Sequence, residues 1–275
     1  MFIDLVQCAS CGKKGRPGVA FNLSIDGLHH RLRCDCGNAF DLPDPRDQCI
    51  LSDNVLVRLG ALSNHHEGGF VDVTPGGSTK VTFSRAFDYP CRAFLTPRGS
   101  QLIYAKEAFL DKTCMVLLAG RHTTDPGPSL AIEVSWSVYG LIGIDALPAW
   151  YVQFYAAATH LANGLFKPAL LDYAGAFELF LEEHLRLRLE GRFGGDCAEL
   201  ILRKSWRVED RCKDILELAA GHKMTERADV YQPWDIHVRQ PRNDLAHGKG
   251  VAVGPEEAEN AHQATYQAIR WIESR

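Results

Sequence analysis

The sequence contains no apolar run long enough to cross a membrane and no excess of positive charge. No apolar run reaches the ~18 residues that a membrane-crossing helix needs, and the first ten residues lack the basic and then apolar order of a secretory signal peptide. We therefore expect a cytoplasmic protein with no membrane partner. Because 30 lysines and arginines stand against 34 aspartates and glutamates, no overall basic field holds nucleic acid, and any contact with RNA or DNA must be local.

Internal repeats and low-complexity segments are also missing. The chain is 46% hydrophobic and 23% charged, which excludes a disordered protein and is typical of a folded soluble one. Its 275 residues, at about 150 residues per domain, predict about two domains. A chain of this length buries close to ~75% of its unfolded surface, so it needs no disulfides to fold.

Four of the nine cysteines are clustered near the N-terminus, as the pairs Cys8 with Cys11 and Cys34 with Cys36. In a cytoplasmic protein this clustering favours metal binding or buried thiols over disulfides. Two tight turns that each present two thiolates match the tetrahedral sulfur coordination of zinc. A glycine directly follows each pair and permits the backbone conformation of a metal knuckle. The first 45 residues or so therefore resemble a zinc ribbon.

The resemblance implies a structural Zn(2+), because four thiolates leave no open position for a substrate. A redox Cys-x-x-Cys or a set of unrelated buried thiols is the alternative. Redox chemistry would need a nearby strand–helix unit, whereas residues 12–15 are typical of a loop. His29 and His30 are additional nitrogen donors nearby, but we interpret them as solvated.

The character of the sequence changes at two places. A Pro-Asp-Pro break at 43–45 predicts a first boundary. Beyond it, short apolar or alternating runs are separated by glycine- and proline-rich turns, which predicts a small antiparallel sandwich or barrel. These runs lie at 55–62, 79–83, 93–96, 115–119 and 130–138. From residue 148 onward the apolar residues recur at helical spacing.

The predicted fold class is therefore a multidomain α+β protein. It comprises a zinc-ribbon-like module at 1–48, a β-sandwich-like domain at 49–147 and a helical domain at 148–275. Residues 81–90 and 132–136 resemble small β-sandwich recognition domains of the lectin type, which implies a ligand bound by loops. Alternating aromatic side chains of an ordinary core explain the same residues. We expect residues 65–67 to form a loop, because adjacent histidines on a strand point to opposite faces.

The helical domain is expected to contain six helices, over 148–163, 168–191, 196–203, 210–220, 238–247 and from 255 onward. Proline and glycine mark several of their ends. The second carries an apolar face at helical spacing, formed by Leu171, Ala174, Phe177, Leu181 and Leu185. Gly248 is placed as the C-terminal cap of the fifth helix.

The most informative segment is Arg-Asn-Asp-Leu-Ala-His-Gly at 242–248. Asn243 and His247 are four residues apart, so on a helix they share one face. An imidazole at a helix C-terminus is suited to proton exchange near neutral pH, and the guanidinium of Arg242 offers a planar fork to a phosphate. Asn243 can fix the histidine tautomer or bind a substrate oxygen. Proton transfer and stabilisation of phosphate charge are what RNA cleavage by an internal 2′-hydroxyl requires.

Here the chain resembles the HEPN family, whose ribonuclease members carry an Arg-x(4–6)-His motif, often Arg-Asn-x-x-x-His. The likeness covers residues 148–273 and includes the segment 172–179, Trp234 and the terminal helix. It implies a homodimer in which two motif copies form one composite site. His247 would be the general acid or base, Arg242 the transition-state clamp, and Asn243 a further catalytic or RNA-contacting residue, while Glu178 would be a polar partner of these groups. Pro241 departs from the pattern, because it removes a helix hydrogen bond directly before the motif.

A local basic patch offers a further RNA contact through Arg203, Lys204 and Arg207 beside Trp206. Nearby acidic residues dilute this patch, so a solvated face explains it equally well. The motif itself has a plain alternative too, because Arg, Asn and His at a helix end also cap carbonyls and form surface pairs.

The sequence thus predicts a metal-independent endoribonuclease that acts on RNA, and the family resemblance adds a homodimer and a role in antiphage defence or as a toxin. The first alternative is a non-catalytic module that recognises nucleic acid, glycan or protein through the zinc ribbon and β domain, with helices that only dimerise. The second is a nucleotide-transfer partner or antitoxin target, in which another protein inhibits the HEPN-like helices. A regulatory protein or ligand is a further expected partner.

Overall fold

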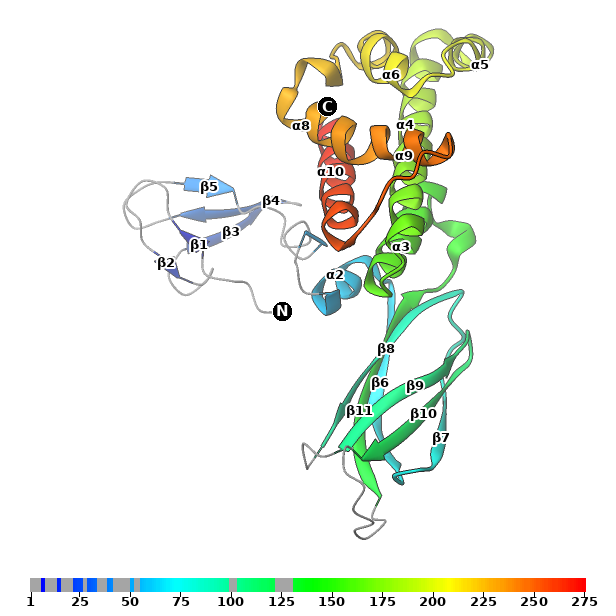
Figure 1. The fold of residues 1–275 in the computed structure, drawn as a ribbon. Coiled ribbons are helices and arrows are strands. Elements are labelled where there is room, and N and C mark those ends of the chain that lie inside the picture. The colour runs from blue at the N-terminus through cyan, green and yellow to red at the C-terminus, as the bar shows by residue number, and fades with distance from the viewer. Residues whose placement is uncertain are drawn as a thin grey trace. The chain divides into compact units, whose positions relative to one another are not determined.

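The computed structural model describes residues 6–7, 14–15, 22–26, 29–33, 39–41, 50–51, 55–98, 103–121 and 131–275. The chain divides into two compact units, residues 1–61 and 62–275. The described part is a mixed α and β protein with a C-terminal helical region, as the sequence predicts (Figure 1).

The described part of the first unit begins with short antiparallel strands and ends within a helix. β1 (Val6–Gln7) pairs with β2 (Lys14–Gly15). A three-stranded sheet has the order β3-β4-β5 and consists of β3 (Asn22–Asp26), β4 (His29–Arg33) and β5 (Ala39–Asp41).

The helix α2 (Val55–Leu62) follows this sheet in the chain, and it corrects the strand predicted at 55–62. An apolar run of eight residues does not distinguish a strand from a buried helix by periodicity. Leucine, alanine and arginine within the run are good helix formers, and their propensity outweighs that of the two valines.

The second unit begins with two antiparallel three-stranded sheets, whose orders are β6-β11-β8 and β7-β10-β9. Their strands are β6 (His65–Val73), β7 (Ser78–Thr82), β8 (Tyr89–Pro97), β9 (Ile103–Leu110), β10 (Cys114–Arg121) and β11 (Ile132–Leu141). Inward-facing side chains of both sheets form one apolar core, including Val73, Met115, Val134 and Val138. Alternation of apolar and polar residues along these strands explains why each sheet buries one face.

The predicted loop at 65–67 is wrong, because these residues start β6. Their backbone pairs with β11, His66 opposite Tyr139 among them. The two histidines do point to different environments: His65 approaches Glu67 at 3.2 Å, while the His66 ring stacks on Tyr139. A complete partner strand, which the local sequence does not reveal, decides the conformation.

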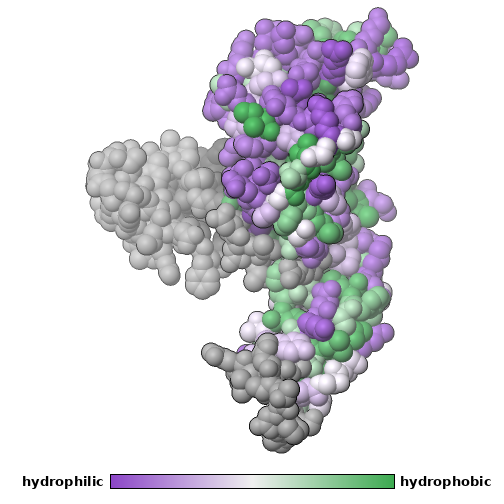
Figure 2. Space-filling model, viewed as in Figure 1, coloured by the Kyte–Doolittle hydropathy of each residue, from purple (hydrophilic) through white to green (hydrophobic). Residues whose placement is uncertain are grey.

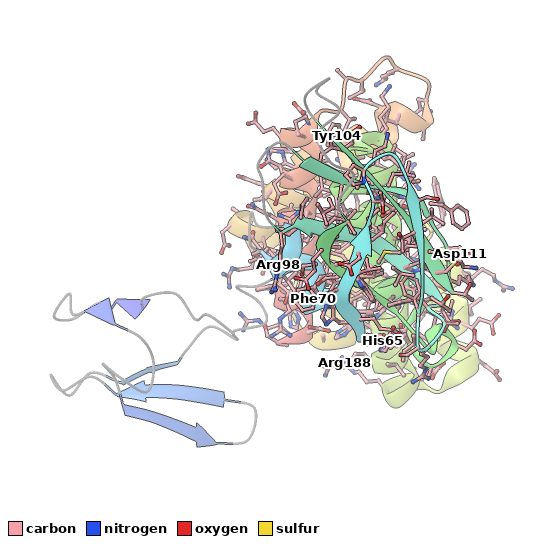
Figure 3. The ribbon with its side chains drawn as sticks, turned by 90° about the horizontal axis from the view of Figure 1, so that it is seen from below. His65, Phe70, Arg98, Tyr104, Asp111 and Arg188 are labelled. Carbon is pink, nitrogen blue, oxygen red and sulfur yellow. The ribbon has the colours of Figure 1, made fainter. Side chains whose placement is uncertain are left out.

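The same sheet also exposes a large apolar side chain of β6 to solvent. Phe70 is 55% exposed, and the Arg98 guanidinium lies 4.2 Å from its ring centroid (Figure 3). Arg98 also pairs with Glu133 at 3.0 Å. This side of the sheet is therefore polar and aromatic, in contrast to the apolar core behind it.

The helical region is dominated by three long helices, α3 (Ala149–Ala162), α4 (Phe166–Phe193) and α10 (Pro255–Glu273). Shorter elements connect α4 to α10: α5 (Gly195–Lys204), α6 (Val208–Asp210), η2 (Arg211–Ile215), α7 (Leu216–Ala220), η3 (Met224–Glu226), α8 (Ala228–Trp234), η4 (Asp235–Arg239) and α9 (Gln240–Ala246). A single turn, η1 (Ile144–Ala146), precedes α3. On the face drawn in Figure 2, hydrophilic side chains predominate at the end that carries α5, α6 and α8.

The apolar face predicted for α4 is confirmed at four of its five positions. Ala174, Phe177, Leu181 and Leu185 are buried, whereas Leu171 is 44% exposed. Phe177 packs on Trp234 with ring centroids 4.7 Å apart. This packing connects α4 to the end of α8. It therefore places Glu178, the residue after Phe177, beside the segment that carries the motif.

The proline before the motif does not break the helix. α8, η4 and α9 follow one another without interruption, and η4 is a wide π-helical turn. Pro241 lies in the first turn of α9 and has no N–H to donate to the preceding turn. The wide turn directly before it accommodates the missing bond, since such turns are found where a helix ladder is interrupted.

Candidate functional site

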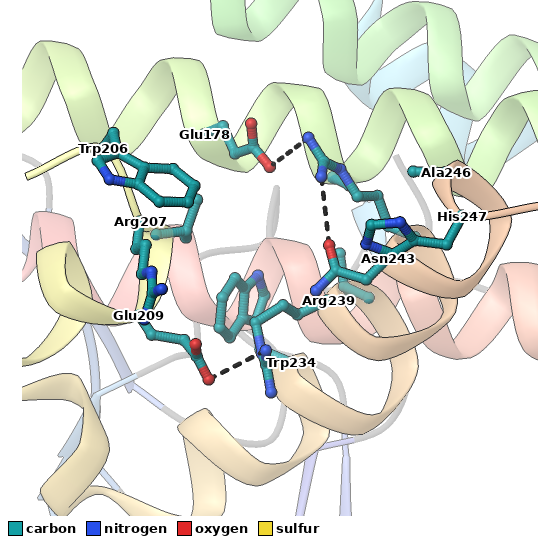
Figure 4. Close-up of a pocket in the computed structure, with 13 residues that line it drawn as sticks. Glu178, Trp206, Arg207, Glu209, Trp234, Arg239, Asn243, Ala246 and His247 are labelled. Atoms are coloured by element: carbon teal, nitrogen blue, oxygen red, sulfur yellow. Dashed lines mark hydrogen bonds and ion pairs between the residues drawn. The ribbon is translucent and has the colours of Figure 1, made fainter.

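The motif residues line a pocket of about 510 Å³ in the helical region (Figure 4). Its walls come from α4, from the segment around α6, and from the run α8–η4–α9. The lining residues are Ala174, Glu178, Trp206, Arg207, Val208, Glu209, Trp234, Val238, Arg239, Arg242, Asn243, Ala246 and His247.

His247 is positioned by the end of α9. The helix ends at Ala246, and His247 donates its N–H to Asn243 O at 3.0 Å. Gly248 has a φ of 69°, the left-handed conformation that glycine adopts without strain. Lys249 N then donates to Asp244 O at 2.9 Å, which completes a Schellman motif. The predicted glycine cap is confirmed, and it leaves the imidazole exposed at the edge of the pocket.

Arg242 is held by two oxygen acceptors. Its Nη2 lies 3.3 Å from Glu178 Oε1, and its Nη1 donates to Asn243 Oδ1 at 3.2 Å. Both carboxylate and guanidinium are only partly exposed, at 35% and 40% of their side-chain surface. The pair therefore orients the guanidinium toward the pocket and contributes little to stability, as is usual for ion pairs in contact with water.

A second ion-pair chain borders the pocket. Arg239 pairs through Nη1 with Glu209 Oε1 at 3.0 Å and through Nε with Asp235. Gln240 Nε2 also donates to Asp235, at 2.6 Å. Burial alone would lower the pKa of Arg239, but the hydrogen bond and charge of Asp235 and the charge of Glu209 raise it. Arg239 is therefore a fixed cation that anchors the Glu209 carboxylate.

Two tryptophans differ in their exposure to the pocket. Trp206 is 73% exposed, and the Arg207 guanidinium lies 5.1 Å from its ring centroid. Trp234 is 2% exposed, and its Nε1–H has no hydrogen-bond partner among the described residues. One indole thus offers a stacking surface to solvent, while the other forms an apolar wall with an unused donor.

The structure brings five of the seven residues predicted for the RNA site together. Arg207, Glu178 and the three motif residues line one pocket, whereas Arg203 and Lys204 are exposed near the end of α5 and do not line it. Sequence reasoning missed Glu209 and Arg239 as site residues. No local signal identifies them, because only the tertiary fold brings α6 next to η4.

The four predicted zinc ligands, Cys8, Cys11, Cys34 and Cys36, lie outside the described residues. The first pair falls in the chain between β1 and β2, and the second between β4 and β5. Among the residues that the structure describes, no group of three or more His, Cys, Asp or Glu side chains is arranged to hold a metal ion.

Within the described ranges, no helix combines the length and apolar character needed to cross a membrane. No family model matches the chain, and neither a curated protein nor a solved structure was found to be similar to it.

Proposed function

We propose that the protein is an endoribonuclease whose site is the pocket at the end of α9. The observation that carries this proposal is that Arg242, Asn243 and His247 line one cavity, with Glu178 at 3.3 Å from the guanidinium. The alternative explanation, that these residues only cap the helix end and form surface pairs, does not account for a pocket around them. The resemblance to the HEPN family supports the same assignment.

The reaction is transfer of a phosphodiester to the neighbouring 2′-hydroxyl. The 2′-oxygen bonds to phosphorus, the bond from phosphorus to the 5′-oxygen breaks, and the products are a 2′,3′-cyclic phosphate and a 5′-hydroxyl. One imidazole accepts the 2′-hydroxyl proton, and a second donates a proton to the leaving 5′-oxygen. This route needs no metal ion.

Each side chain has a role in that step. His247 at the exposed helix end exchanges the proton, and Arg242 stabilises the charge that develops on the phosphate oxygens. Glu178 and Asn243 are positioning residues, because both bind the guanidinium rather than the substrate. A preoriented guanidinium needs no reorganisation during the reaction, which is the source of its catalytic effect.

A homodimer completes this scheme, since two imidazoles are needed and each chain carries one in the motif. The family resemblance supports a dimer through the helical region, RNA as substrate, and a role in antiphage defence or as a toxin. A regulatory protein or ligand would then act by opening or closing the shared cleft.

A structural Zn(2+) held by Cys8, Cys11, Cys34 and Cys36 remains part of the proposal. The described strands support it, because each cysteine pair lies in the chain between two paired antiparallel strands. Such a hairpin end is where a zinc ribbon carries its ligands. Metal analysis of the purified chain, with Cys34→Ser as comparison, tests this part separately.

The second candidate is a recognition module, and the outer face of the β6-β11-β8 sheet favours it. Tyr139 stacks on His66 and contacts Phe94 edge-on, which makes a row of rings across three strands. Binding of a nucleic acid, glycan or protein that survives changes at Arg242 and His247, but fails when Cys34 is replaced, would support this alternative.

The test of the nuclease is cleavage of RNA by the purified full-length chain in excess chelator. His247→Ala and Arg242→Ala are each expected to lower the rate constant by about 100- to 10,000-fold, the usual contribution of a general acid–base group or a charge-stabilising donor. His237→Ala is the matched control, because His237 lies on η4 and does not line the pocket. Equal cleavage by the wild type and His247→Ala would refute the catalytic assignment.

A further inference from the structure

The rim of the pocket carries a surface suited to a nucleobase. Trp206 is exposed over 73% of its surface. This is unusual for tryptophan, which is highly buried on average. Arg207 lies over its ring and adds a positive charge beside it. Stacking of one base on such a side chain strengthens the binding of single strands by about 5- to 150-fold and accepts any base.

A carboxylate stands on the same side of the pocket, three residues further along the chain. Glu209 Oε1 forms an ion pair with Arg239 Nη1 at 3.0 Å, and no interaction of Oε2 is found within the described residues. The side chains of Arg239 and Asp235 are 23% and 17% exposed, but that of Glu209 is 46% exposed. The less exposed side chains of Arg239 and Asp235 therefore hold the Glu209 carboxylate in place, and this carboxylate stays open to solvent on its other side.

The chemistry of the base edges decides which base such an acceptor selects. An ionised carboxylate only accepts hydrogen bonds, so it binds best to an edge with two adjacent donors. Guanine presents N1–H and the N2 amino group side by side. Adenine and cytosine each place a ring-nitrogen acceptor beside their amino group, and uracil places carbonyl oxygens on both sides of its one N–H. In all three bases an acceptor would therefore face the carboxylate oxygens and repel them.

The size of the cavity is compatible with one nucleotide. Its volume of about 510 Å³ lies within the ~300–1,000 Å³ of small-molecule sites. Trp234 closes one wall of the cavity with a buried indole that is 2% exposed.

We infer that the Trp206–Glu209 side of the pocket is a base-binding subsite that selects guanine in single-stranded RNA. The inference deepens the proposed nuclease and rests on it for the identity of the polymer. Trp206 stacks on the base, Glu209 accepts from N1–H and N2–H, and Arg239 acts as a positioning residue for the carboxylate. The competing explanation is that the Glu209–Arg239 pair only ties α6 to η4.

The probe is guanosine monophosphate, compared with adenosine monophosphate, bound to the full-length chain and measured by titration calorimetry. A bidentate contact to one base typically gives about 10-fold discrimination or more, so the guanine nucleotide is expected to bind at least about 10-fold more tightly. Glu209→Gln should bring the two dissociation constants together, because the amide replaces one acceptor with a donor. Trp206→Ala should weaken both nucleotides to a similar extent.

Glu199→Gln is the matched control, because this exposed carboxylate lies on α5 and does not line the pocket. If Glu209→Gln does not fold, Glu209→Asp keeps the charge, withdraws it from the base, and should still reduce the preference. Equal affinity for the two nucleotides, or no binding of either up to millimolar concentration, overturns the inference. If the protein prefers the guanine nucleotide but does not cleave RNA, the nuclease proposal is refuted and the guanine subsite stands. If it cleaves RNA but binds both nucleotides equally, the subsite is refuted and the nuclease proposal stands.

Discussion

The β region and the helical region of the second unit bury polar atoms very differently. Within the described residues, six buried side-chain nitrogen or oxygen atoms have no hydrogen-bond partner, and all six belong to the helical region. They are in Thr159, His184, His222, Trp234, Thr265 and Trp271. The core shared by the two sheets consists instead of apolar side chains such as Val73, Met115 and Val134.

Departures from regular structure occur in both regions. The sheets have register irregularities at Val116/Leu117 and at Tyr139/Gly140. Both π-helical turns, η2 and η4, and the pocket that holds the motif lie in the helical region. Violations of local folding rules tend to gather where a protein has a function to perform, because they are kept only against a cost in stability. The unpaired buried polar atoms therefore favour the helical region as the location of the proposed site, and the two sheets are the simpler packing unit.

The first prediction concerns Glu178, which joins α4 to the motif. Glu178→Gln removes the charge that orients Arg242 and should lower the RNA cleavage rate by about 10-fold, which corresponds to about 1.4 kcal/mol in the activation free energy. The free energy of unfolding should change little, because the ion pair is partly exposed.

A double-mutant cycle is the control for this prediction. If Glu178 acts through Arg242, its replacement should have almost no further effect in an Arg242→Ala background. Independent, additive losses in the cycle would show that Glu178 has a separate role and that the positioning argument is incorrect.

The second effect concerns an unpaired hydroxyl in α10. Thr265 is fully buried, and its Oγ1 has no hydrogen-bond partner among the described residues. Thr265→Val has nearly the same shape and removes the hydroxyl, so it should raise the free energy of unfolding by about 1 kcal/mol in denaturant titration.

The reverse change in the sheet core provides the matched comparison. Val134 is equally buried on β11, so Val134→Thr should lower the free energy of unfolding by about 1–3 kcal/mol. The same sign for both substitutions would mean that the two cores do not differ in polar satisfaction.

The smallest effect is a pH dependence of stability from His184 and His222. Burial, followed by the nearby positive charge of Arg188, lowers the pKa of His184 below its ordinary value of 6.5. Burial likewise lowers the pKa of His222. Below about pH 6.5 the unfolded chain binds these protons more readily than the folded chain, so their contribution to stability is present above that pH and decreases as the pH falls.

Unfolding free energies measured between pH 7.5 and 5.5 test this dependence. The decrease in the wild type should be reduced when both residues are replaced by asparagine, with His160→Asn as a control, because His160 hydrogen-bonds Asp172 near the surface. A profile that is the same in wild type and double variant would assign the dependence to other groups.

Much of the helical region could be predicted from the sequence because its signals are local. The spacing of Ala174, Phe177, Leu181 and Leu185 places them on one face of α4, and all four are buried. Leu171 shares the same spacing and is exposed, because periodicity defines a face but not how far the neighbouring helices extend over it. The run at 55–62 shows a second limit, since a short apolar stretch is compatible with either element.

The sequence by itself determined the arrangement of Asn243, His247 and Gly248, because helix periodicity and the left-handed preference of glycine act within a few residues. Only the tertiary structure decided that Glu178 binds Arg242 and that Arg239 binds Glu209. Those partners lie on different helices, and packing such as that of Phe177 on Trp234 brings them together. Contacts between distant segments depend on how complete surfaces fit, which no short stretch of sequence specifies.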